Sequence, residues 1–194
     1  MPYARSWYIL QKLKIAMAWR DSRYRLSGTV ELDEAYFGAP DPHGKGRRTA
    51  RSKAFVAVSL SPDGKPRFVK IRLAKRLDSR FVKRFAAQEI EPGTRVCTDG
   101  LNIYQSLAEH YQHEPVVAKG KPKDSILHWA HIVISNAKAF IEGTFHGLDG
   151  KHLQRYLDEF CYRFNRRYRE DELFDRLLVA CITTPPTTYG ELTE

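Results

Sequence analysis

Two aspartates stand where a carboxylate has no evident packing role. Asp33 lies in segment 29–36, whose residues alternate in the manner of a β-strand and place it on the same face as Glu31. Asp99 precedes Gly100 at the end of a short apolar segment, the edge of an α/β sheet at which reactive groups gather. Asp33 and Asp99 are therefore the first candidates for chemistry.

The chemistry open to two such carboxylates depends on whether they meet in space. Carboxylates that meet repel each other, and a hard divalent cation such as Mg²⁺ or Mn²⁺, bound through oxygen, relieves that repulsion. Two such ions about 3.5–4 Å apart orient an attacking water or hydroxyl and stabilise the leaving oxygen of an in-line phosphoryl displacement. An Asp before Gly is also an ordinary turn former, so each aspartate alone has a structural interpretation as well.

Composition points to an anionic partner. The chain has 194 residues with 32 Lys and Arg against 23 Asp and Glu, which gives a formal charge of +9 and a pI near 9.5. An apolar content of 42% supports a hydrophobic core and excludes wholesale disorder. No apolar run approaches the ~18 residues of a membrane span, and the three cysteines form no Cys-x-x-Cys pair. We expect a soluble, cytoplasmic, nucleoid-associated protein without a zinc ribbon or a disulfide framework.

Basic segments suit a duplex DNA substrate, because Lys and Arg neutralise phosphates. One Gly- and Pro-bounded loop carries Lys45, Arg47, Arg48, Arg51 and Lys53, and a second carries Lys119, Lys121 and Lys123. Further arginines, Arg163, Arg166, Arg167 and Arg169, are expected on the outer surface of a C-terminal helix, where they could follow a DNA strand. That helix has aromatic residues at helical spacing, Tyr156, Phe160, Phe164 and Tyr168, which predict core contacts and not a base-stacking platform.

Hydrophobic periodicity predicts the elements that position these residues. In chain order we expect a helix at 6–19, strands at 29–36, 54–60 and 67–75, a helix after Asp78, a strand at 94–98, a helix after Gly100 and a strand near 115–118. A segment at 126–141 that is helical in its second half follows, and then helices over 153–168 and 173–181. We divide the chain into an N-terminal segment at 1–27, a catalytic domain at 28–183 and a loose tail at 184–194.

Several sequence blocks resemble bacterial insertion-sequence transposases of the IS1595, or ISXO2-like, family. The blocks occur in the family's order: VELDEAYFG at 30–38, CTDG at 97–100 with Tyr104, GTFHG at 143–147, KHLQRYLDEF at 151–160 and RFNRR at 163–167. The resemblance implies an α/β fold with a ribonuclease-H-like, retroviral-integrase-like mixed sheet flanked by helices. A short N-terminal helix and a long helical C-terminal region complete the expected architecture.

The resemblance also implies the metal site. Asp33 and Asp99 match the first two carboxylates of the family's acidic triad, and Lys138 matches a Lys that follows the third position. Relatives with Glu as third residue place it seven residues before that Lys, where this chain has His131. A subgroup with Asn in place of Glu makes Asn136 the preferred third residue, and His131 and Glu142 remain the alternatives.

The activity implied is Mg²⁺-dependent DNA strand cleavage by water, followed by attack of a DNA 3′-hydroxyl, by a homo-oligomer assembled on transposon ends. Relatives carry a DNA-binding segment before the catalytic core, and this chain begins within what resembles its last helix, so we expect an N-terminally truncated protein. The alternative function is a catalytically inactive transposase remnant that only binds DNA.

Overall fold

The computed structural model describes residues 2–38, 51–116, 126–145 and 150–193. The chain folds as two compact units, one comprising Arg25–His146 and the other Met1–Tyr24 with Gly147–Glu194. No helix in the part of the chain that the structure describes is both long and apolar enough to cross a membrane. The division into 1–27, 28–183 and 184–194 stays a prediction.

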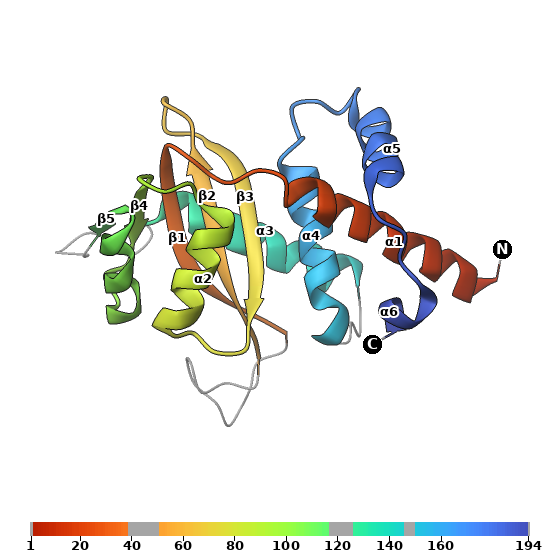
Figure 1. Cartoon of the computed structure of the whole chain (residues 1–194), viewed down its shortest axis with the longest axis horizontal. Coiled ribbons are helices and arrows are strands. Elements are labelled where there is room, and N and C mark those ends of the chain that lie inside the picture. Colours follow the sequence, from red (N-terminus) through yellow and green to blue (C-terminus); the bar gives the residue numbers. More distant parts are fainter. Residues whose placement is uncertain (1, 39–50, 117–125, 146–149, 194) are drawn as a thin grey trace. The chain divides into compact units, whose positions relative to one another are not determined.

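A five-stranded mixed sheet forms the centre of the unit Arg25–His146 (Figure 1). Its strands are β1 (Thr29–Phe37), β2 (Ser52–Leu60), β3 (Pro66–Ala74), β4 (Arg95–Thr98) and β5 (Gln112–Pro115). Their order in the sheet is β3-β2-β1-β4-β5, with β1, β2 and β3 antiparallel and β4 and β5 parallel to β1. This topology confirms the expected ribonuclease-H-like mixed sheet.

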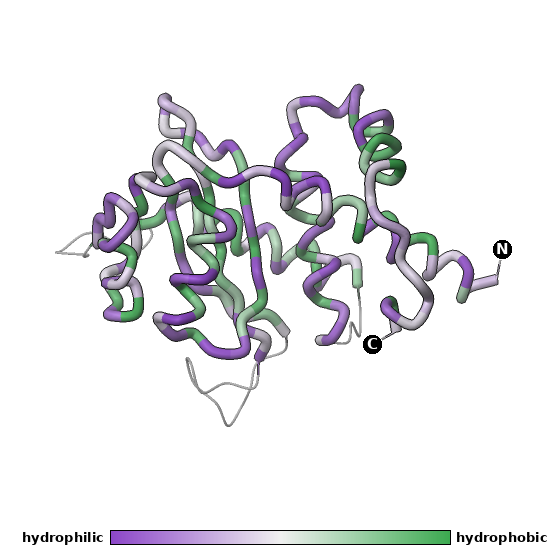
Figure 2. Tube along the Cα trace, viewed as in Figure 1, coloured by the Kyte–Doolittle hydropathy of each residue, from purple (hydrophilic) through white to green (hydrophobic). Residues whose placement is uncertain are grey.

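Helices cover both faces of this sheet. The first face packs against α2 (Ser79–Glu89) and the 3₁₀ helix η2 (Asn102–Glu109), in a core that contains Val30, Leu32, Phe85 and Tyr104. Helix α3 (His128–Thr144) packs on β1 and β2 through the opposite face. Figure 2 shows apolar residues running through the strands and alternating with hydrophilic ones along α2. The alternation along β1 therefore separates its residues between two buried faces.

Two elements of this unit differ from the sequence prediction. The segment after Gly100 is a 3₁₀ helix, in which three residues per turn place the buried Tyr104 and Leu107 on one side. Strand β5 runs over Gln112–Pro115 and not 115–118, because it pairs in register with β4 and ends where β4 ends. The remainder of the predicted strand, from residue 117, lies outside the described residues.

The second unit is helical. It contains α1 (Tyr3–Asp21), the 3₁₀ helix η4 (Gly150–His152), α4 (Leu153–Phe164), α5 (Leu173–Thr183) and α6 (Tyr189–Thr193). Helix α4 packs against α1 and buries Tyr156, Leu157 and Phe160. Helix α4 ends at Phe164 and not at Tyr168, and Tyr168 is 82% exposed. The prediction that Tyr168 belongs to the core was therefore wrong.

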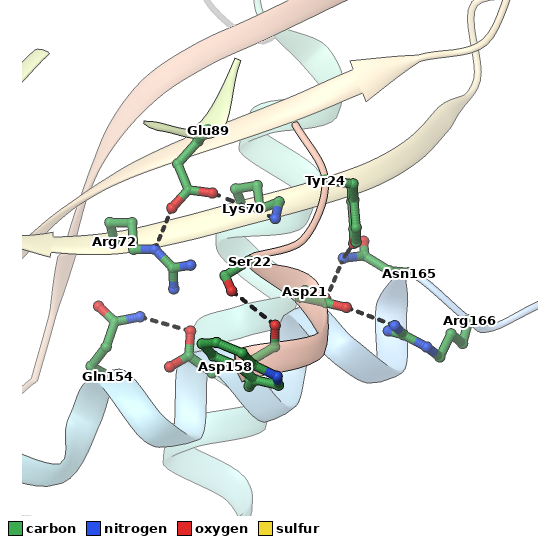
Figure 3. Close-up of polar contacts among 11 residues, drawn as sticks. Asp21, Ser22, Tyr24, Lys70, Arg72, Glu89, Gln154, Asp158, Asn165 and Arg166 are labelled. Atoms are coloured by element: carbon green, nitrogen blue, oxygen red, sulfur yellow. Dashed lines mark hydrogen bonds and ion pairs between the residues drawn. The ribbon is translucent and has the colours of Figure 1, made fainter. Parts of the chain in front are cut away.

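Buried ionic contacts join α1 to the end of α4 (Figure 3). The Arg166 guanidinium donates to Asp21 Oδ1 at 2.7 Å, and Asn165 Nδ2 donates to Asp21 Oδ2 at 3.0 Å and to the Tyr24 hydroxyl at 2.8 Å. Arg166 is only 9% exposed, so its expected role on a DNA-tracking surface was wrong. A buried aspartate requires a cation, and Arg166 supplies it.

A comparable buried ion pair lies further along the same two helices. Lys14 Nζ on α1 is 3.0 Å from Glu159 Oε2 on α4, and the two side chains are 0% and 6% exposed. Burial lowers the pKa of Lys14, while the charge of Glu159 acts in the opposite direction. Glu159 also accepts a hydrogen bond from Arg163 Nε at 2.9 Å, so one buried carboxylate offsets two cations.

Candidate active site

The pairing of β1 with β4 brings the two candidate aspartates together. The strands run parallel with Thr29 opposite Arg95 and Glu31 opposite Cys97, a constant offset of 66 residues. Asp33 lies two residues beyond Glu31 on β1, and Asp99 lies two residues beyond Cys97, just past the last residue of β4. Because neighbouring strands lie about 4.8 Å apart, we expect this register to bring the two residues close together. The charge of Asp99 is also one of the influences on the pKa of Asp33.

The Asp33 carboxylate is buried and held at both oxygens. Asp33 is 8% exposed; its Oδ1 accepts the backbone N–H of Glu34 at 2.8 Å, and its Oδ2 lies 3.2 Å from Nε2 of His131. Burial raises the pKa of Asp33 to about 6, and the negative charge of Asp99 acts in the same direction. The Glu34 hydrogen bond and the charge of His131 act against this rise. The site therefore holds a carboxylate in surroundings that disfavour its ionised form.

Asp99 occupies a more open position. It is exposed, and its Oδ1 accepts the backbone N–H of Leu101 at 3.2 Å. The following Gly100 has φ +80°, a left-handed conformation that favours glycine. This turn ends β4 and leaves the Asp99 carboxylate exposed, close enough for its charge to act on the buried Asp33.

Glu31 positions the helix that carries His131. Helix α3 begins after Leu127, which has φ 52° and provides no side-chain cap, and no acidic residue lies in its first turn. Instead, Glu31 Oε2 on β1 accepts the backbone N–H of Ala130 at 2.8 Å. Burial raises the pKa of Glu31, while hydrogen bonds from the backbone of Ala130 and Trp129 oppose the rise. Sequence reasoning placed Glu31 on the face of Asp33 but missed this capping role, because the capped helix lies 99 residues away along the chain.

The helical period decides which residues of α3 share the flank of His131. At about 100° per residue, Lys138 lies within about 20° of His131 around the helix axis, and Glu142 also lies within about 20°. Asn136 lies about 140° away from His131 by the same period, and it is exposed. The structure therefore brings His131 to Asp33 and does not bring Asn136 to it. Glu142 is eleven residues from His131, about 16 Å along the axis.

The donor set can be tested against a divalent cation. Among the described residues, no three or more His, Cys, Asp or Glu side chains are grouped so as to hold a metal ion. Asp33 and Asp99 supply two neighbouring carboxylates, and Mg²⁺ is commonly bound by one or two carboxylates together with waters and substrate phosphates. The raised pKa of Asp33 also reflects repulsion that a cation would remove. Asp33 and Asp99 thus fit a Mg²⁺ site whose remaining ligands are waters and substrate phosphates.

Of the eight predicted DNA-binding residues on the two basic loops, only Arg51 and Lys53 fall within the part of the chain that the structure describes. Lys45, Arg47, Arg48, Lys119, Lys121 and Lys123 lie outside it. Arg51 and Lys53 are described at the start of β2, where Lys53 pairs with Tyr36 of β1. Arg51 Nε donates to the backbone carbonyl of Gly38 at 3.1 Å, which joins the end of β1 to the start of β2.

Comparison with known proteins gives a family and two solved structures. Residues 25–165 match the family described as the ISXO2-like transposase domain. No curated protein matches. The crystal structure of the catalytic domain of Mos1 mariner transposase is similar at 13% identity with a TM-score of 0.33, covering 90% of this chain and 92% of that chain. The Mos1 transposase paired-end complex with left transposon end is similar at 12% identity with a TM-score of 0.29, covering 93% of this chain and 63% of that chain.

Proposed function

Because this chain belongs to the ISXO2-like transposase domain family, we propose that it catalyses divalent-metal-dependent cleavage and transfer of DNA strands at insertion-sequence ends. The observation that carries the proposal is the juxtaposition of Asp33 and Asp99. Asp33 lies on β1, Asp99 directly follows the neighbouring strand β4, and the Asp99 charge acts on Asp33. Two neighbouring carboxylates that can hold a divalent cation, in a protein with a net positive charge, are suited to phosphoryl transfer on DNA.

Asp33 and Asp99 would hold the cation between them. A bound Mg²⁺ or Mn²⁺ supplies Lewis-acid polarisation of the phosphate and lowers the pKa of the attacking water or 3′-hydroxyl. Asp33 offers a carboxylate whose orientation is already set by the Glu34 backbone N–H and by His131. Asp99 offers an exposed carboxylate that remains accessible to DNA. Asp33, which is buried, therefore provides a rigid ligand, and Asp99, which is exposed, contacts the substrate.

We assign the third position of the site to His131 in preference to Asn136. His131 contacts Asp33 directly and remains 41% exposed, so it can orient that carboxylate or accept a proton at the mouth of the site. Asn136 points away from this flank of α3. Lys138 follows His131 on the same flank, about 10 Å along the helix, where its ammonium can neutralise a phosphate of bound DNA.

A strand-nicking assay tests the proposal. The full chain is incubated with a duplex carrying the inverted repeat that flanks its gene, in the presence of Mg²⁺ or Mn²⁺. Asp33→Asn and Asp99→Asn should each reduce nicking at least about 100-fold, because loss of a ligand removes several kcal/mol of transition-state stabilisation. His131→Ala should also reduce nicking, whereas the matched Asn136→Ala on the other flank should not. Nicking by Asp33→Asn at the unmodified rate would remove the assignment.

The partner proposed is double-stranded DNA, bound as transposon ends and as target, with the chain acting as a homo-oligomer. An inactive remnant would bind the same duplex and show a salt-dependent affinity, but no cation would promote cleavage. Metal titration separates the two cases, since only an intact carboxylate site is stabilised against unfolding by Mg²⁺.

A further inference from the structure

A second basic surface lies apart from the two aspartates. The connection from β3 to α2 and the first two turns of α2 surround a hollow of about 420 Å³. Its lining residues are Lys75, Arg76, Asp78, Arg80, Phe81 and Arg84, and we call this feature the basic hollow. Four cations against one carboxylate give it an excess of three positive charges, the difference of 4 and 1.

The cations of the basic hollow have no carboxylate ion-pair partner in the described part of the chain. None of its four cations forms an ion pair with a carboxylate among the residues that the structure describes. The one carboxylate, Asp78, is engaged elsewhere, because its Oδ1 accepts the backbone N–H of Phe81 at 2.9 Å as the N-cap of α2. By contrast, Lys83 on the same helix is paired with Glu109 at 2.8 Å. The net excess of three positive charges around one hollow favours an anionic ligand.

Phe81 determines which part of a nucleic acid the hollow can take. Its ring stacks on Phe55 with centroids 5.6 Å apart, and the Arg84 guanidinium lies over it at 4.6 Å from the centroid. Phe55 and Arg84 already contact the Phe81 ring, so the ring supports the Arg84 guanidinium and is not available to stack on a nucleobase. A stacked guanidinium loses less freedom when its N–H groups bind phosphate oxygens. The hollow is therefore suited to backbone phosphates.

The spacing of two of the cations is comparable with the spacing of DNA phosphates. Arg80 and Arg84 are four residues apart on α2, about 6 Å along its axis, which is close to two phosphate steps of about 3.4 Å each along the axis of one DNA strand. Lys75 and Arg76 directly follow Ala74, which pairs with Lys53 of β2, and Lys53 pairs with Tyr36 of β1. The hollow thus lies at the end of the sheet toward which β1 runs.

The strand register relates the basic hollow to the carboxylates. Tyr36 is three residues beyond Asp33, about 10 Å along β1, and β3 is two strands away from β1, about 10 Å across the sheet. Both distances are shorter than one turn of duplex DNA, about 34 Å. The basic hollow belongs to the face of the sheet that α2 covers, whereas Asp33 contacts His131 of α3 on the opposite face, so the hollow is a separate contact and not a continuation of the carboxylate site.

We propose that the basic hollow binds the phosphodiester backbone of duplex DNA at a position separate from the carboxylate site; this inference rests on the proposed function. Its contacts position the duplex and read no bases, because its four cations bind phosphate oxygens and carry no sequence information. It shares no residue with the two predicted basic loops.

The test measures binding of the full chain to a duplex oligonucleotide in EDTA, over a range of salt concentrations. Arg80→Gln and Arg84→Gln should each lower the slope of log Kobs against log[salt] by about 0.9, with roughly eightfold weaker binding at about 0.1 M salt. Lys83→Gln is the matched control: it removes one charge from the same helix outside the hollow and should leave the slope nearly unchanged. Far-UV circular dichroism should show the same helix content in all variants.

Equal slopes for the unmodified chain and the Arg80 and Arg84 variants would overturn the proposal. A Lys83→Gln loss as large as theirs would also overturn it, because the effect would then follow net charge alone. Since EDTA prevents cleavage, these outcomes are independent of the nicking assay. Absence of nicking with intact Arg-dependent binding would refute the proposed activity and leave the basic hollow standing.

Discussion

Replacing Asp33 by Asn should stabilise the cation-free protein at neutral pH. In the folded state the pKa of Asp33 is raised to about 6 from an ordinary value of 3.8, first because the carboxylate is buried and further because Asp99 is near. The folded protein therefore binds a proton at Asp33 more tightly than the unfolded chain does. Stability falls as pH rises from about 4 to about 6, and the loss persists at higher pH.

The magnitude follows from the displacement of this pKa. The pKa of Asp33 rises by about 2.2, and each pKa unit is worth about 1.36 kcal/mol. The free energy of unfolding at pH 7.5 is therefore lowered by roughly 3 kcal/mol. The Asp33 side chain is only 12% exposed, so little of this is screened by solvent. For a chain of this size, about 3 kcal/mol corresponds to roughly 6–12 °C in Tm. The amide in Asn has no charge to desolvate and retains an oxygen that can accept the Glu34 N–H.

The assay is urea unfolding of the two proteins in EDTA, from pH 4 to pH 7.5. Their free energies of unfolding should be nearly equal at pH 4 and should diverge by up to about 3 kcal/mol at pH 7.5, with Asp33→Asn the more stable. Asp99→Asn should raise the free energy of unfolding at pH 7.5 by a smaller amount, because the Asp99 charge is only one of the causes of the raised Asp33 pKa. Asp171→Asn, at an exposed position in the other unit, should follow the unmodified chain.

Adding Mg²⁺ should then raise the stability of the unmodified chain and leave Asp33→Asn unchanged, because binding to the folded state alone stabilises it. A difference between the two proteins that stays constant from pH 4 to pH 7.5 would refute the reasoning. So would an Asp33→Asn protein that is the less stable of the two at pH 7.5 in EDTA.

Two further predictions concern stability and are measured by the same urea unfolding. Glu89 lies between Lys70 and Arg72 at 3.4 Å and 2.6 Å (Figure 3), and Glu89→Ala should cost about 3–5 kcal/mol because it removes a buried carboxylate that contacts Lys70, itself 2% exposed. Glu109→Ala, which removes an exposed partner of Lys83, should cost much less, and equal losses would contradict the argument. Glu31→Ala should cost about 1–2 kcal/mol by uncapping α3, and Glu31→Gln less because its amide oxygen can still accept; identical losses would exclude a capping role.

Local patterns predicted much of the fold. Alternation in β1 and β3 and helical spacing in α2 and α4 predicted these elements to within a few residues, because the faces that they bury repeat at the period of the element. The apolar, β-branched composition of 54–60 predicted β2. The helix after Gly100 failed as an α-helix, since eight residues with Tyr104 and Leu107 three apart fit a 3₁₀ helix equally well. Arg166 was misplaced because an arginine on a helix gives no local sign that a buried Asp21 will meet it.

The sequence by itself determined the two aspartates, the element order and the family motifs, because these depend on residue types and on short periods along the chain. Only the tertiary structure decided that His131 and not Asn136 meets Asp33, that Glu31 caps α3, and that Lys70 lies buried beside Glu89. Such contacts arise when strands and helices distant in the chain pack in one register, and the free energy that selects this register is a property of the whole core and not of any segment.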